Sequence, residues 1–187
     1  TEKIVTMFFP LEKIKHEGEA EIVIETIIEN DNIIVNARMY SKQLTKKDTL
    51  ASGDDRCNRL SLLLYDALSQ LTGFKPPWGI LYGVRPARLM HATVEALGEE
   101  NAKKKFLNDR VQPQKVNLAL EVMHRENQII KLSVDNSFSL YISIPFCPSR
   151  CSYCSFVSHS IHNAGDLIEP YVELLCAELK RNGEIAN

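Results

Sequence analysis

The sequence predicts an α+β domain followed by the first β/α unit of a truncated, TIM-type (β/α) partial barrel. Apolar residues alternate with polar ones before residue 40, recur with a helical period from about residue 54, and form one strand–loop–helix pattern after residue 136. The polar stretch around residue 135 predicts domains of residues 1–135 and 136–187. Because one β/α unit cannot bury both of its faces, we expect the rest of the barrel to lie outside this sequence.

The first forty residues predict β-structure. Residues 22–29 and 33–39 both show alternating apolar positions, and the Asn-Asp-Asn sequence at 30–32 between them is typical of a turn. These features predict a hairpin with one buried face. Residues 3–9 are a candidate for a further strand.

Three helices are predicted in the remainder of the first domain. An apolar stripe over residues 60–71 ends at Gly73, and a second helix begins at Pro86 and ends at Gly98. A third helix begins near Pro113. The first domain is therefore expected to contain a hairpin followed by helices.

The second domain is predicted to begin with a strand at residues 139–144 and to end with a helix. The helix opens at Glu169 and Pro170 and ends at Gly183. The residues expected on its buried face are Tyr171, Leu174, Leu175 and Leu179.

Charge and hydropathy narrow the possible partners. The chain has 24 acidic and 22 basic residues and a net charge of −2, so it has no general attraction for nucleic acid or an anionic membrane. It contains neither a secretory leader nor an apolar stretch of membrane-spanning length. We therefore expect a cytoplasmic protein with no nucleic-acid or membrane partner.

Three of the five cysteines, Cys147, Cys151 and Cys154, lie within eight residues. Such clustering indicates metal ligands in a reducing compartment and not a disulfide framework. A C-x3-C-x2-C loop can direct three thiolates to one face of an iron–sulfur cluster, whereas electron-transfer clusters usually have four cysteine ligands. One iron would then be open to chelation by an amine and a carboxylate. Cys57 and Cys176 lie on apolar helical faces and are interpreted as buried core residues.

This loop resembles the signature of radical S-adenosylmethionine enzymes, in which an aromatic residue, here Tyr153, precedes the third cysteine. Residues 141–147 (Tyr-Ile-Ser-Ile-Pro-Phe-Cys) are similar to the oxygen-independent coproporphyrinogen III oxidase (dehydrogenase) branch of that superfamily. Residues 78–86 (Trp-Gly-Ile-Leu-Tyr-Gly-Val-Arg-Pro) resemble an N-terminal extension found in part of that branch. On this resemblance the chain is identified as an N-terminal fragment of such a protein.

The resemblance implies a radical S-adenosylmethionine oxidoreductase of haem biosynthesis. Its reaction would be the oxidative decarboxylation of coproporphyrinogen III to protoporphyrinogen IX, with a 4Fe–4S cluster and a 5'-deoxyadenosyl radical. It implies that Cys147, Cys151 and Cys154 ligate iron and that Tyr141 and Tyr153 lie beside bound S-adenosylmethionine. The implied partners are a porphyrinogen-type substrate and an electron donor whose identity the sequence does not give. The fragment alone is expected to be inactive.

Two departures from the resemblance leave alternatives open. Phe156 stands where established coproporphyrinogen dehydrogenases have a further cysteine, and Ser143 stands where they have a histidine. Both differences suit relatives of these enzymes, some of which are haem chaperones, so a haem chaperone on the same scaffold is the first alternative. The second is a zinc-organised interaction module with His159 or His162 as the fourth ligand.

Overall fold

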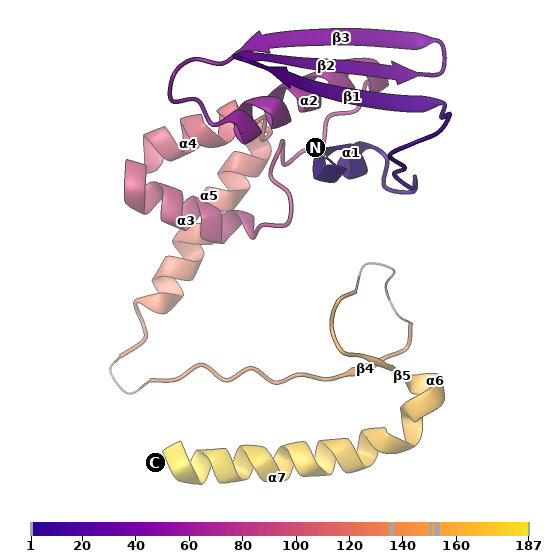
Figure 1. The fold of residues 1–187 in the computed structure, drawn as a ribbon. Helices are drawn as coiled ribbons and strands as arrows, with labels where there is room; N and C mark the ends of the chain where they lie inside the picture. The colour runs from indigo at the N-terminus through magenta and orange to yellow at the C-terminus, as the bar shows by residue number, and fades with distance from the viewer. Residues whose placement is uncertain (1, 135–136, 150, 152–153, 187) are drawn as a thin grey trace. The chain divides into compact units, whose positions relative to one another are not determined.

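The chain forms two compact units, Thr1–Val134 and Asp135–Asn187. The computed structural model shown in Figure 1 describes residues 2–134, 137–149, 151 and 154–186. Each unit has its own secondary structure and is described by itself.

The first unit contains a three-stranded antiparallel sheet of strands β1 (Ile22–Glu29), β2 (Asn32–Met39) and β3 (Lys42–Thr49), in the order β1-β2-β3. The predicted hairpin is confirmed, with a register that pairs Ile22 with Met39. Strand β3 was not predicted, because its sequence is mostly polar and carries three lysines. Charged residues of this kind are typical of an edge strand, where they discourage pairing with another chain.

The predicted strand at residues 3–9 is wrong, because helix α1 (Glu2–Phe8) occupies this segment. Ile4 and Phe8 are four residues apart and therefore lie on one helical face, and both are buried. The Phe8 ring packs edge-on against Tyr65, with ring centroids 5.6 Å apart. Periodicity cannot distinguish helix from strand in so short an apolar run.

Helix α2 (Arg56–Thr72) forms the first hydrophobic core together with the inner face of the sheet. The core residues Val35 and Ala37 come from β2, and Leu64 and Leu68 come from α2. All four are at most 1% exposed. The predicted end of this helix is confirmed, because Gly73 adopts a left-handed conformation with φ of 76°.

A second core lies among helices α3 (Pro86–Leu97), α4 (Glu99–Asn108) and α5 (Pro113–Ile130). The predicted boundaries of α3 and the start of α5 are confirmed. Helix α4 was not predicted, because its only buried residues, Ala102 and Phe106, are too few to give a clear helical period. Both lie within the second core, and Phe106 is 1% exposed.

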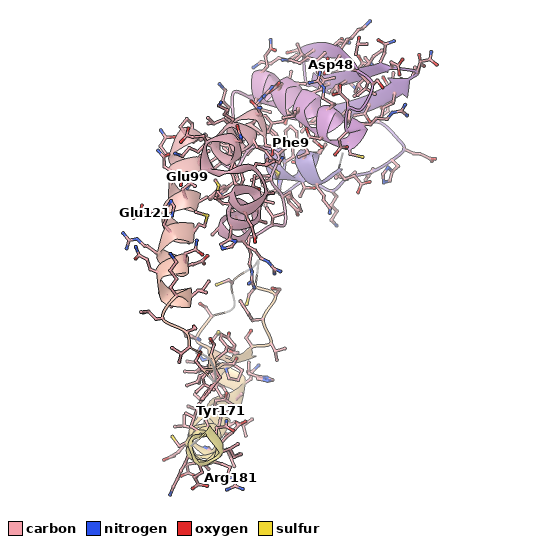
Figure 2. The ribbon with its side chains drawn as sticks, turned by 90° about the vertical axis from the view of Figure 1, so that its left-hand side faces the viewer. Phe9, Asp48, Glu99, Glu121, Tyr171 and Arg181 are labelled. Atoms are coloured by element: carbon pink, nitrogen blue, oxygen red, sulfur yellow. The ribbon has the colours of Figure 1, made fainter. Side chains whose placement is uncertain are left out.

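Ion pairs accompany this second core along α4 and α5. The Glu99 carboxylate, labelled in Figure 2, lies 2.9 Å from Lys103 Nζ and 3.2 Å from His124 Nε2. The hydrogen bond from Lys103 lowers the pKa of Glu99 below its ordinary value. His124, which lies on a charged helix face, is exposed.

The segment around Gly79 connects the two cores of the first unit. Trp78 forms an isolated antiparallel bridge with Val111, and the Ile80 N–H donates to the Asp109 carbonyl oxygen at 2.9 Å. Beside this contact the Arg110 guanidinium donates two hydrogen bonds, of 2.8 and 2.7 Å, to the Asp66 carboxylate of α2. This two-pronged geometry fixes orientation as well as distance.

We expect Gly79→Ala to destabilise the first unit strongly. A Cβ atom at residue 79 would lie 2.0 Å from the Asp109 carbonyl oxygen, and Gly79 has a φ of 59°. Backbone atoms cannot move aside cheaply, so the free energy of unfolding should fall by more than about 3 kcal/mol in urea denaturation.

The matched control is Gly73→Ala. Gly73 also has a positive φ, of 76°, but nothing lies within 4 Å of its added Cβ. Left-handed strain alone should cost about 1–2 kcal/mol. Equal losses of stability in the two variants would contradict the close approach at residue 79.

The second unit contains two short strands followed by helices. Strand β4 (Phe146–Cys147) pairs in parallel with β5 (His159–Ser160). Helix α6 (Ile161–Ala164), the 3-10 turn η1 (Gly165–Leu167) and helix α7 (Ile168–Ala186) follow, as Figure 1 shows.

Two sequence expectations for this unit are wrong. Residues 139–144 form no strand, because no strand of the described chain pairs with them, and a β-ladder needs a neighbour for its backbone hydrogen bonds. Helix α7 continues past Gly183 to Ala186, since Gly183 does not adopt the left-handed conformation that ends many helices. On the expected buried face of α7, Leu174 is 72% exposed, whereas Tyr171, Leu175 and Leu179 are half-buried.

Candidate functional site

The loop that carries the three cysteines is closed at its base. The β4–β5 pairing places Phe146 opposite His159 and Cys147 opposite Ser160. The His159 N–H donates to the Pro145 carbonyl oxygen at 2.7 Å, as the parallel pairing of Phe146 with His159 requires. The two ends of the segment between Cys147 and His159 therefore lie side by side.

The three thiols lie on this closed loop with different exposures. Cys147 and Cys154 are half-buried, Cys151 is exposed, and none is in a disulfide. The Cys154 N–H donates to the Cys151 carbonyl oxygen at 3.0 Å, which links the second and third cysteines through their backbones. Cys147 lies at the end of β4.

The structure does not gather the three sulfur atoms. Among the described residues, no three His, Cys, Asp or Glu side chains are arranged to hold one metal ion. The donor set nevertheless suits an iron–sulfur cluster, since three thiols lie on one loop that is fixed at both ends. Metal ligands commonly come together only when the metal binds, because binding and local folding are coupled.

The histidines of the zinc alternative lie where the loop ends and just after it. His159 is in β5, and its ring is 6.3 Å from the Phe146 ring, while His162 is exposed in α6. In the part of the chain that the structure describes, neither is grouped with the cysteines around a common point.

The structure describes one of the two tyrosines that are expected beside S-adenosylmethionine. Tyr141 lies in the segment before β4 and is 79% exposed, so its ring is accessible to a ligand. Tyr153 lies outside the described residues. Their roles stay predictions.

Tyr171 contacts the site in a way that the sequence did not reveal. Its hydroxyl donates a hydrogen bond to the Ser143 carbonyl oxygen. Its ring packs edge-on against Phe146, with centroids 5.3 Å apart. The sequence assigned Tyr171 only to the apolar face of α7, and the one available signal was an aromatic residue with a polar hydroxyl directly after Pro170.

The interpretation of Cys57 and Cys176 as buried core residues is wrong, because both are exposed. Cys57 lies in the first turn of α2, where its N–H is bonded to the Asp55 carboxylate at 2.9 Å. Cys176 lies on α7.

Comparison with known proteins gives one relative. The chain is 28% identical over 153 residues to the oxygen-independent coproporphyrinogen-III oxidase-like protein HemZ of Bacillus subtilis strain 168. The match covers 80% of this chain, which spans about 30% of the length of that relative. No protein-family model matches the chain. No solved structure matches it either.

The similarity makes a coproporphyrinogen-III oxidase-like protein a distant relative of this chain. Among the described helices, none combines the length and the apolar character that a membrane span requires.

We expect each of the three loop cysteines to be required for iron binding. Cys147→Ala, Cys151→Ala and Cys154→Ala should each lose most of the iron bound after anaerobic reconstitution, because removing one of three thiolates leaves too few ligands for the cluster. Iron and acid-labile sulfide per chain are the measurements.

Two cysteines outside the loop provide matched controls. Cys57→Ala and Cys176→Ala also remove exposed thiols, and both variants should keep the full iron content. Iron loss in these controls equal to that in the loop variants would contradict the assignment.

Proposed function

We propose that this chain supplies the cluster-binding loop of a radical S-adenosylmethionine oxidoreductase that converts coproporphyrinogen III to protoporphyrinogen IX. The observation that carries the proposal is the C-x3-C-x2-C loop, closed at its base by the pairing of β4 with β5. The similarity to a coproporphyrinogen-III oxidase-like protein supports the same reaction class.

The proposed ligands are the thiolates of Cys147, Cys151 and Cys154. A bound and reduced 4Fe–4S cluster supplies the electron that cleaves the sulfonium of S-adenosylmethionine. The chain's own contribution is to present three thiolates from one closed loop, which leaves one iron without a cysteine ligand from this loop. Tyr141 is accessible just before this loop and would contact the bound S-adenosylmethionine.

The proposal includes a barrel in which residues 139–144 become a paired strand. Apolar residues alternate with serines and Tyr141 in and just before this segment, so one face of such a strand would be apolar. The side chains of that face are exposed within the second unit: Phe138, Leu140, Ile142 and Ile144. An exposed apolar face of this kind is typical of a surface that another part of a protein covers.

The experiment uses the full-length protein, reconstituted with iron and sulfide without oxygen. With a reductant and S-adenosylmethionine it should release methionine and deoxyadenosine, and with coproporphyrinogen III it should also form protoporphyrinogen IX. Deoxyadenosine without protoporphyrinogen would reject the substrate and keep the enzyme class. A colourless protein with one tightly held zinc would reject the class.

Haem carriage is a second candidate function. It is favoured by Phe156, which replaces the further cysteine of the dehydrogenases and is 72% exposed, so that a flat apolar ligand can reach it. A haem carrier should bind haem in an absorbance titration and transfer it to an apo-haemoprotein. Conversion of coproporphyrinogen III without haem binding would exclude this candidate.

A further inference from the structure

We propose that Tyr171 is a positioning residue for Cys147. Its hydroxyl and its ring hold the short stretch of chain that carries the first of the three thiols. This inference rests on the proposed cluster-binding function of the loop, although the contact itself can be tested in the metal-free protein.

Tyr171 holds this stretch at two points. Its hydroxyl bonds to the carbonyl oxygen of Ser143, and its ring packs on Phe146, directly before Cys147. Between these points the Pro145 carbonyl oxygen accepts the His159 N–H at 2.7 Å. Proline fixes its own φ, which removes one backbone rotation between Ser143 and Cys147.

The tyrosine hydroxyl substitutes for a missing strand partner. Within the described chain no strand pairs with residues 137–144, so these backbone groups lack the hydrogen bonds of a ladder. The Ser143 carbonyl instead receives a hydrogen bond from a side chain 28 residues further along. A backbone acceptor that is satisfied in this way holds the segment in one place.

The contact is specific for one of the three cysteines. Tyr171 reaches the segment that leads into Cys147, and the structure gives it no hydrogen bond to the described parts of the loop after β4. Cys147, which directly follows Phe146, is half-buried, whereas Cys151 is exposed on the loop and Cys176 is exposed on α7. Loss of the Tyr171 hydroxyl should therefore change the environment of Cys147 and leave the environments of Cys151 and Cys176 unchanged.

Alkylation of individual thiols in the metal-free, reduced full-length protein tests this inference. Tyr171→Phe removes the hydroxyl and keeps the ring against Phe146. The rate at which N-ethylmaleimide modifies Cys147 should rise by about two- to tenfold, the effect of one ordinary hydrogen bond. Peptide mass spectrometry follows each cysteine, and Cys151 and Cys176 serve as internal references.

The matched control is Tyr40→Phe, which removes a hydroxyl from a tyrosine in the first unit that is 62% exposed. It should leave all alkylation rates at their wild-type values. An unchanged Cys147 rate in Tyr171→Phe would overturn the inference. So would an equal rise at Cys147, Cys151 and Cys176, because that result indicates general loosening of the unit.

A second measurement separates this inference from the proposed function. In the iron-loaded protein, Tyr171→Phe should shift or broaden the electron paramagnetic resonance signal of the reduced cluster, while Tyr40→Phe leaves the signal unchanged. If wild-type protein binds no iron but the Cys147 rate rises in Tyr171→Phe, the proposed function fails and the contact stands. If iron binds but neither readout changes, the positioning role fails and the proposed function stands.

Discussion

The candidate site depends on one constraint, the two-residue parallel pairing between β4 and β5. This pairing places Cys147 opposite Ser160 and makes the intervening segment a closed loop. Without it, three cysteines in eight residues would lie on an open chain, and ordering them around a cluster would cost more conformational entropy. The hydrogen bond from His159 to Pro145 and the ring contact between Phe146 and Tyr171 stabilise the same base of the loop.

The first unit is stabilised by different means. It has two hydrophobic cores, one between the sheet and α2 and the other among α3, α4 and α5. The close approach of Gly79 to the backbone of Asp109 joins them, together with the two hydrogen bonds from Arg110 to Asp66. The residues of both cores belong to the first unit, and the three loop cysteines belong to the second.

Local signals in the sequence predicted most of the first unit. The apolar stripes of α2, α3 and α5 have a helical period, and Gly73, Pro86, Gly98 and Pro113 mark their ends. Helix α4 and strand β3 were missed because they are mostly polar and each depends on neighbouring elements. The strand expected at residues 139–144 illustrates the opposite error, since an apolar pattern forms a strand only beside a partner. The spacing of the three cysteines could be recognised because it is local in sequence. The contact of Tyr171 could not, because it joins residues 28 apart.

In the proposed site, three thiolates on one closed loop hold a cluster with an iron open to S-adenosylmethionine. The most direct test is Mössbauer spectroscopy of the full-length protein, reconstituted with iron-57 and measured before and after S-adenosylmethionine is added. We expect a 4Fe–4S spectrum in which one iron changes its isomer shift on addition, because that iron gains the amine and carboxylate as ligands. A spectrum that S-adenosylmethionine leaves unchanged, or a protein that takes up no iron, would overturn the proposed assignment.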